Sequence, residues 1–283
     1  SHISELSYLV NLEGKNHSGL TGRHRIMKVA ALYDIHSNLP ALEAVFGEVQ
    51  SSGAEKIVVG GDVFPGPMPR ETIKRLLSLG LPVEFIHGNA DREVLARMQG
   101  KDTDAVPERF RPAIRWVAEQ LHPEYDRLIA GCPLTRKVAI QGLGEVSFCH
   151  ATPRSDTQLF SRLTSETLLR PIFDNLDVSV VVCGHTHMPF DRMVGRTRVV
   201  NAGSVGAAYE KTGASWLLLG PTVQHRHTSY DLAKAAEQIR ATNYPLAEDF
   251  ARNLLEPLTE KEVLADISKR ELIEANALET SAK

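Results

Sequence analysis

The sequence Lys-Val-Ala-Ala-Leu-Tyr-Asp-Ile-His-Ser-Asn, residues 28–38, decides the fold of this chain. Its apolar run, residues 29–33, predicts a strand buried on both faces, because a half-exposed strand would alternate apolar and polar residues. The run leads into Asp34 and His36, two residue types that bind metals. From Asn38 onward the apolar spacing becomes that of a helix. A buried strand, a polar turn and a helix in this order predict the first unit of an α/β sheet.

Strands and helices continue to alternate on the C-terminal side of this stretch. The predicted strands are residues 29–33, 57–59, 83–86, 134–141, 145–149, 178–183, 196–200, 215–219 and 222–230. Helices are expected at residues 38–50, 70–79, from about 91, 107–121 and 166–173. The first half therefore reads as βαβαβ and the second half is richer in strands, which indicates an α/β protein.

Three segments of the chain differ in pattern. Residues 1–26 carry no sustained periodicity, and we expect a tag or a dispensable N-terminal extension there. Residues 27–230 carry the strand and helix alternation and form the expected main domain. Residues 231–283 are charged and amphipathic, which predicts a helical C-terminal extension that packs on the core or makes a subunit contact in a homo-oligomer. Its helices are expected at residues 232–241, 246–255 and 261–277.

The composition argues against several classes of protein. The chain has 283 residues, of which 42% are hydrophobic and 24% are charged, as in ordinary globular proteins. Its formal net charge of −3 gives no support for a nucleic-acid partner. Three widely spaced cysteines without a Cys-x-x-Cys pair favour buried thiols in a reducing cytoplasm over a zinc ribbon or a disulfide framework. No apolar run approaches the roughly 18–20 residues that a membrane span requires.

Metal-binding residue types follow the predicted strands, at the point where each strand ends. In open α/β sheets the carboxyl ends of the strands form the ligand crevice, so we expect these side chains to meet at one edge. The segments are Asp34-Ile35-His36, Gly61-Asp62, Gly88-Asn89-Ala90-Asp91, His150 and Gly184-His185-Thr186-His187. Each segment alone is a weak signal, but the ordered set predicts a metal site.

Two of the segments carry a pair of metal-binding residues separated by one residue, and we expect each pair to point in the same direction. Residues i and i+2 of an extended backbone point to the same side, so Asp34 with His36, and His185 with His187, would each aim two ligands into one cavity. Glycines such as Gly88 allow tight turns and close backbone approach. Imidazole and carboxylate ligands together suit Mn²⁺, Fe, Zn²⁺, Ni²⁺ or Co²⁺, with Mn²⁺ the expected ion.

This ordered set resembles the calcineurin-like metallophosphoesterase superfamily. Residues 34–38, Asp-Ile-His-Ser-Asn, and 201–206, Asn-Ala-Gly-Ser-Val-Gly, look specifically like its small bacterial phosphodiesterase branch. The resemblance covers residues 28–230. It implies a four-layer αββα sandwich, in which two mixed β-sheets are flanked by helices and a dinuclear metal site lies at one edge.

The resemblance also implies roles for individual residues of this chain. One divalent metal would be held by Asp34, His36, Asp62 and His187, and the other by Asp62, Asn89, His150 and His185. Asp62 would bridge the two ions, since a carboxylate has two oxygens. A metal-bridging hydroxide would attack a small phosphoester substrate in line, without a covalent enzyme intermediate. Asp62, Asn89 and Asp91 are the expected catalytic residues.

Ala90 departs from the pattern of the family, in which many members carry a histidine that protonates the leaving group. Asp91 would orient that histidine, and its alternative role is a favourable anion in the first turn of a helix. Asn38 and Arg154 are candidate substrate contacts, with a helix N-cap and a surface arginine as their alternative interpretations. A phosphodiesterase is expected ahead of a phosphomonoesterase. The alternative from another class is a weakly catalytic interaction scaffold on the same fold.

Overall fold

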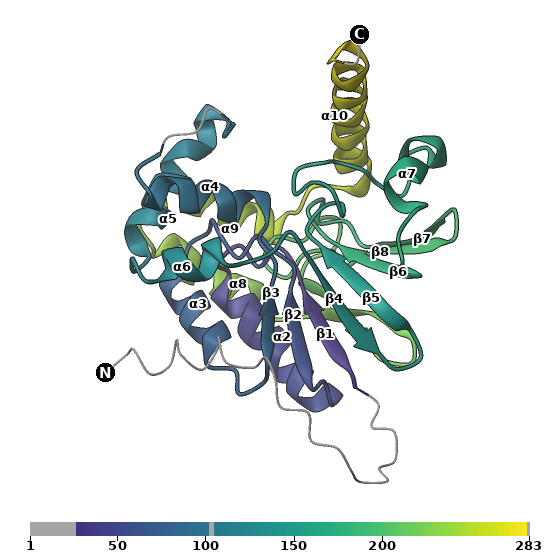
Figure 1. The fold of residues 1–283 in the computed structure, drawn as a ribbon. Helices are drawn as coiled ribbons and strands as arrows, with labels where there is room; N and C mark the ends of the chain where they lie inside the picture. The colour runs from purple at the N-terminus through teal and green to yellow at the C-terminus, as the bar shows by residue number, and fades with distance from the viewer. Residues whose placement is uncertain (1–26, 102–104, 282–283) are drawn as a thin grey trace.

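The computed structural model describes residues 27–101 and 105–281, with side chains as far as residue 271. The expected N-terminal tag or extension, residues 1–26, lies outside the described residues. Two five-stranded sheets pack against each other, and helices cover their outer faces (Figure 1). This arrangement confirms the predicted α/β sandwich of two mixed sheets flanked by helices, followed by C-terminal helices.

The first sheet contains the parallel strands that open the chain. Its order is β10 (Val223–Thr228), β9 (Ala214–Leu219), β1 (Val29–Leu32), β2 (Lys56–Val59) and β3 (Val83–Phe85). Strand β1 is parallel to β2 and antiparallel to β9. Because β1 lies in the middle, its carboxyl end opens at the centre of the sheet edge.

The second sheet contains the strands of the second half of the chain. Its order is β4 (Thr135–Ile140), β5 (Gly144–Cys149), β6 (Val180–Cys183), β8 (Thr197–Asn201) and β7 (Phe190–Val194). Strand β6 lies between the parallel strands β5 and β8. The carboxyl ends of β5 and β6 therefore lie side by side.

Helices cover both outer faces of the sandwich. The helices are α2 (Leu39–Ser52), α3 (Pro69–Leu77), α4 (Asn89–Met98), α5 (Arg111–Gln120), α6 (Tyr125–Ala130), α7 (Glu166–Phe173), α8 (Leu232–Arg240), α9 (Ala247–Leu255) and α10 (Glu260–Ser281), with a 3₁₀ turn, η1, at Glu108–Phe110. Helices α2 to α6 share a hydrophobic core with the first sheet, and α7 shares one with the second sheet. No helix in the described part of the chain has both the length and the apolar composition needed to cross a bilayer.

Strand β1 is buried on both of its faces, which explains why apolar and polar residues do not alternate in its sequence. Ala30 and Leu32 face the core formed with the helices. Val29, Ala31 and Tyr33 face the core between the two sheets. Both faces are covered, so every residue of the strand is apolar.

The sequence pattern did not predict β7 or α6. Strand β7 carries two charged residues, Asp191 and Arg192, and only its ends, Phe190 and Val194, are buried, so its apolar signal is weak. Helix α6 is six residues long, and Ile129 is its buried residue, which is too short for a helical period to be recognised. The expected burial of the Cys149 and Cys183 thiols is confirmed.

Candidate metal centre

The structure brings the predicted metal ligands together at one edge of the sandwich. Two groups of possible ligand atoms form there, each with its atoms within 4.8 Å of one another. The first group is Asp34, His36 and His187, and the second is Asp62, His150 and His185. In each group the aspartate follows a strand of the first sheet, and at least one histidine follows a strand of the second.

The backbone at these positions is left-handed. The prediction that each ligand pair converges because its backbone is extended is therefore wrong. Asp34 and His36 have φ angles of 52° and 47°, and His185 and His187 have φ angles of 67° and 58°. Asp62 has a φ of 50°. Residues other than glycine rarely adopt this conformation, which costs about 1–3 kcal/mol each and is found mostly at functional sites. The ligand pairs converge through tight turns and not through extended backbone.

The first group leaves acceptor atoms facing each other. His36 Nδ1 and His187 Nδ1 lie 3.2 Å and 2.7 Å from the carbonyl oxygens of Pro65 and Ala207, so both Nδ1 atoms carry the proton. The two Nε2 lone pairs then lie 3.1 Å apart, and the His187 Nε2 lies 3.4 Å from Asp34 Oδ1. This Asp34 oxygen is buried and has no hydrogen-bond partner in the described part of the protein. A cation would satisfy all three atoms.

In the second group, acceptor atoms also face one another. His150 Nδ1 lies 2.9 Å from the Gly60 carbonyl oxygen, which directs His150 Nε2 to within 3.5 Å of Asp62 Oδ2. His185 Nε2 lies 3.2 Å from the Thr157 carbonyl oxygen, so its Nδ1 faces the centre. One terminal atom of the Asn89 amide lies 3.2 Å from His150 Nε2 and 3.1 Å from His185 Nδ1. With the amide oxygen at that position, acceptors again face acceptors, as expected around a cation.

Asp62 lies between the two groups. Its Oδ1 accepts a hydrogen bond of 3.0 Å from the backbone N–H of Ala90. Its Oδ2 lies 3.5 Å from His150 Nε2 in the second group and 4.0 Å from His36 Nε2 in the first. The free oxygen of this one carboxylate therefore faces both groups.

The aspartates are ionised despite their burial. Burial opposes ionisation of Asp62, but attraction to the nearby His150 outweighs it and lowers the pKa of the carboxyl. The pKa of Asp34 is lowered in the same way by His187. In return, Asp62 raises the pKa of His150 to about 10 against the effect of burial, and Asp34 raises the pKa of His187.

The other two imidazoles are kept neutral. Burial and the charge of His187 lower the pKa of His36. Burial and the charge of His150 lower the pKa of His185 to about 4. Each group thus places the negative charge of a buried carboxylate beside two imidazoles, and this negative field favours a positive charge at both groups. A divalent cation fits each donor set.

Two glycines are required by close contacts with the aspartates. A Cβ atom on Gly88 would lie 2.1 Å from Asp62 Oδ1, and a Cβ atom on Gly184 would lie 2.5 Å from Asp34 Oδ2. Any larger residue would displace a carboxylate, which confirms the expected close backbone approach at these positions.

The second motif of the resemblance, residues 201–206, ties together the turns that carry the ligands. Asn201 Nδ2 donates to the Gly184 carbonyl oxygen at 2.7 Å, and Ser204 Oγ donates to the Asp34 carbonyl oxygen at 2.8 Å. These side chains face the backbone of the ligand turns and stabilise their left-handed conformation.

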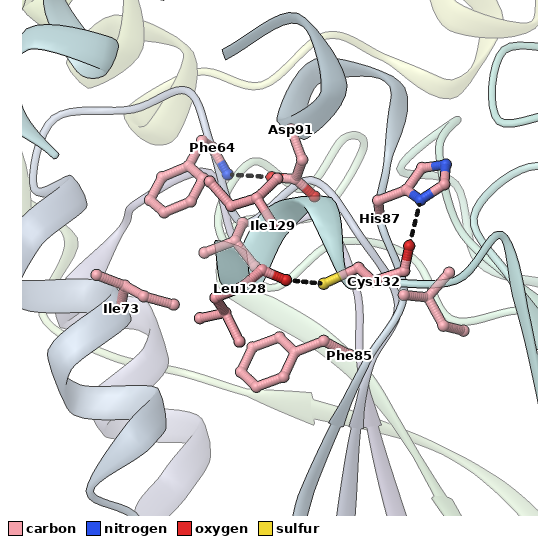
Figure 2. A pocket seen from close by; sticks show the side chains of 10 residues that line it. Phe64, Ile73, Phe85, His87, Asp91, Leu128, Ile129 and Cys132 are labelled. Atoms are coloured by element: carbon pink, nitrogen blue, oxygen red, sulfur yellow. Dashed lines mark hydrogen bonds between the residues drawn. The ribbon is translucent and has the colours of Figure 1, made fainter. Parts of the chain in front are cut away.

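Asp91 lies beneath the site and not in it. Its two carboxylate oxygens accept hydrogen bonds of 3.0 Å from the backbone N–H groups of Phe64 and Gly88. It lines a cavity of about 20 Å³ whose other walls are mainly apolar side chains. Figure 2 shows Asp91 above Ile129 and Leu128, with Cys132 and His87 in the same lining. Burial and the charge of Asp62 raise the pKa of Asp91 to about 7. These contacts match the helix-end role, because Asp91 closes the first turn of α4.

The two candidate substrate contacts lie in different surroundings. Asn38 is buried, and its Oδ1 accepts from the Ala41 N–H as the N-cap of α2. Its Nδ2 donates to the Gly206 carbonyl oxygen at 2.8 Å, so both ends of the amide are engaged within the protein. Arg154 is exposed on the loop of residues 151–160, which follows His150. A substrate contact by either residue stays a prediction.

Several residues at the site were not identified from the sequence. The carbonyl oxygens that fix the imidazoles carry no sequence signal, because every residue has one. Tyr209 stacks on His187 with ring centroids 5.2 Å apart. Asp156 lies on the 151–160 loop and pairs with Arg92 of α4 at 2.9 Å and 3.2 Å. Nothing in the sequence pattern places Tyr209 or Asp156 near the ligands.

The chain is similar to proteins from several organisms. An uncharacterized protein of Methanocaldococcus jannaschii is 26% identical over 237 residues, which cover 77% of this chain and 93% of that protein. A hypothetical protein of Pyrococcus horikoshii OT3 superposes with a TM-score of 0.67 and 21% identity, covering 81% of this chain and 98% of that one. A metallophosphoesterase of Sphaerobacter thermophilus gives a TM-score of 0.64 and 23% identity, covering 82% and 99%. The two solved structures support the fold.

A protein-family model described as the calcineurin-like phosphoesterase superfamily domain matches residues 27–222. This range includes both groups of candidate ligands and ends before helices α8, α9 and α10. The chain therefore belongs to the calcineurin-like phosphoesterase superfamily.

Proposed function

We propose that this protein is a dinuclear metal-dependent phosphoester hydrolase that prefers phosphodiesters. The observation that supports this most directly is the position of Asp62 Oδ2, which faces the His36 imidazole of one group and the His150 imidazole of the other. A carboxylate between two sets of converging acceptors fits two neighbouring cations bridged by one ligand.

The proposed ligands form two sets, one for each metal ion. Asp34, His36 and His187 would hold one ion, and Asn89, His150 and His185 the other, with Asp62 shared between them. Two divalent cations supply a water of lowered pKa and neutralise the charge of the phosphate. The carbonyl partners of the imidazoles hold each ring in the tautomer that presents its lone pair to the ion. Burial of Asp34 and His150 excludes bulk water from one side of the centre.

The preference for diesters rests on Ala90 and on the motif resemblance. Ala90 supplies no proton donor where many family members have a histidine, so substrates with good leaving groups should react best. Asp91 does not replace that histidine, because both of its oxygens accept from backbone N–H groups. We propose Mn²⁺ as the resident ion, since the donor set of imidazole, carboxylate and amide suits it.

We infer that residues 27–230 form the catalytic domain and that residues 231–283 form its helical extension. All three cysteines, which lie within the described residues, are unpaired, and this supports a reducing compartment such as the cytoplasm.

The experiment that tests the proposal compares two substrates. Chelator-treated protein is assayed with bis-p-nitrophenyl phosphate and with p-nitrophenyl phosphate, with and without added Mn²⁺. We expect turnover that depends on the metal and is faster with the diester. No turnover with Mn²⁺, Ni²⁺, Co²⁺ or Zn²⁺, in protein shown to bind two ions, would instead favour an interaction scaffold.

The control for this assay is Asp62→Asn. Loss of a partner behind a metal ligand costs about 10–100-fold in affinity or activity, so loss of the shared ligand itself should reduce turnover at least that much. Asp249→Asn makes the same chemical change on the exposed face of α9, far from the ligands in sequence and paired with Arg252, and should leave turnover unchanged. Near-normal turnover of the metal-loaded Asp62→Asn protein would rule out the assigned role.

A further inference from the structure

We propose that helix α10 is a structural support of the metal centre, which it stabilises through Tyr209 and the loop of residues 151–160. The inference rests on the proposed dinuclear site and concerns a helix outside the range of the family match. Figure 1 shows α10 rising from the body of the molecule at the top of the view. Its first turns contact segments that lie directly behind the ligands.

The start of α10 is fixed in place by polar contacts. Thr259 and Glu262 form a capping box, in which the Thr259 N–H donates to Glu262 Oε2 at 2.9 Å. Glu260 Oε1 accepts a hydrogen bond of 2.8 Å from Arg162 Nε, and the same ion pair brings an Arg162 terminal nitrogen to 2.7 Å. The Glu210 N–H donates to the Leu258 carbonyl oxygen at 2.8 Å. The helix is therefore held against both the segment around Arg162 and the segment around Glu210.

A small apolar cluster lies beneath these contacts. It consists of Leu159, Met188, Val263 and Ile267, with Tyr209 packed against it. The four aliphatic side chains are at most 6% exposed. Since Val263 and Ile267 are one turn apart on α10, one face of the helix closes the cluster.

The cluster reaches the first group of ligands through Tyr209. The Tyr209 ring stacks on the His187 imidazole at 5.2 Å with an interplanar angle of 21°. The other neighbour of His187 is the His36 ring, at 4.9 Å. The Tyr209 ring thus lies against the His187 imidazole, and Met188, the next residue along the chain, belongs to the same cluster.

The cluster reaches the second group through Leu159. Two residues earlier in the same loop, the Thr157 carbonyl oxygen lies 3.2 Å from His185 Nε2 and fixes that ring. The adjacent Asp156 carbonyl oxygen lies 3.3 Å from the Asn89 amide. Loss of packing under Leu159 would therefore loosen the carbonyl partner of His185 and the loop segment beside Asn89.

The test measures metal affinity and not activity. Ile267→Ala removes packing from the cluster, and Leu254→Ala makes a comparable change in the separate α8 and α9 core. Metal-free wild type and both variants are titrated with Mn²⁺ and Zn²⁺ by calorimetry, and their melting temperatures are recorded with and without metal. Because partners behind metal ligands typically contribute 10–100-fold in affinity, we expect Ile267→Ala to bind about 10-fold more weakly. Leu254→Ala should lower the melting temperature similarly and bind metal normally.

Tyr209 provides a second pair of variants that leaves α10 intact. Tyr209→Phe keeps the stacked ring and should retain wild-type affinity, whereas Tyr209→Ala should bind metal about 10-fold more weakly. These variants decide the question if Ile267→Ala does not fold. Wild-type affinity in both Ile267→Ala and Tyr209→Ala would overturn the inference. Wild-type protein that binds fewer than two ions would contradict the proposed function itself.

Discussion

The two aspartates at the strand ends each use one oxygen to fix their position and leave the other for a cation. Asp34 Oδ2 accepts from the His185 N–H at 2.9 Å, and Asp62 Oδ1 accepts from the Ala90 N–H at 3.0 Å. The remaining oxygens face imidazole nitrogens. Each carboxylate is therefore oriented before an ion binds, which reduces the entropy lost on binding.

Both oxygens of Asp91 accept hydrogen bonds from backbone N–H groups, so neither is left for a cation. Asp91→Asn should therefore mainly affect stability. Both oxygens accept from buried N–H groups, whereas an asparagine would turn an NH₂ group toward one of these donors. We expect the free energy of unfolding to fall by about 1–3 kcal/mol, the cost of one unsatisfied buried group. Urea denaturation of metal-loaded protein measures this. A large loss of turnover at unchanged stability would instead support the catalytic role expected from the sequence.

Ala90 is the residue that limits the choice of leaving group, and Ala90→His should widen it. Ala90 lies in the first turn of α4, next to the amide of Asn89. General acid help contributes about 10²–10⁴-fold, so even an imperfectly placed imidazole should raise the rate on an alkyl phosphodiester about 10-fold. Rates on alkyl and p-nitrophenyl diesters are compared, with Ala96→His of the same helix as the control. Equal rates for Ala90→His and wild type on the alkyl diester would count against this explanation.

Among the elements, α4 and the 151–160 loop form one unit at the second group of ligands. Arg92 of α4 pairs with Asp156 through two hydrogen bonds, and the loop carbonyls of Asp156 and Thr157 face Asn89 and His185. Because the Arg92 side chain is 47% exposed, the ion pair itself should add little to stability. Its effect should be on the position of the loop.

Arg92→Gln should therefore weaken metal binding mainly at the second group. We expect about 10-fold weaker binding of one ion and a smaller effect on the other, since the Asp156 and Thr157 carbonyl oxygens lie beside Asn89 and His185, which both belong to the second group. A titration that resolves two binding steps measures this. Arg252→Gln, in an exposed ion pair with Asp249, is the matched control. Equal weakening of both steps would show that the ion pair acts on the whole site.

In the whole molecule, the candidate metal centre joins the two sheets. Asp34, His36 and Asp62 follow strands of the first sheet, and His150 and His185 follow strands of the second. Apart from the core between the sheets, each bound ion would be a further connection across the sandwich. Metal binding and folding are then linked, because the ligands converge only when both sheets are packed.

Removal of metal should accordingly lower the melting temperature. An ion present at 100 times its dissociation constant stabilises the fold by about 2.7 kcal/mol, which corresponds to about 5–10 °C for a chain of this size. Thermal scans of chelator-treated protein, before and after Mn²⁺ is restored, measure the change. Asp62→Asn should show a much smaller recovery. A melting temperature insensitive to the chelator, in protein shown to lose its metal, would contradict the proposed connection between the sheets.

The sequence by itself determined the kind of fold and the residue types of the candidate site. The continuous apolar run of β1 predicted a buried strand, because that signal is local. The ordered set of aspartates and histidines at the predicted strand ends, among them Asp34, Asp62 and His150, predicted a metal site. The Asn38 N-cap and the Asp91 contact in the first turn of α4 are also local, and the sequence predicted each of them as one of two possible roles.

Only the tertiary structure decided how these pieces meet. The proximity of Asp34 and His187 depends on the packing of one sheet on the other, which no local pattern encodes. The same is true of the Tyr209 stack and of α10, whose apolar face predicted packing but not its partner. The left-handed turns at the strand ends are imposed by buried contacts and differ from the extended backbone that the spacing suggested. Local chemistry is encoded in residue types, whereas long-range geometry depends on how the whole chain buries its apolar faces.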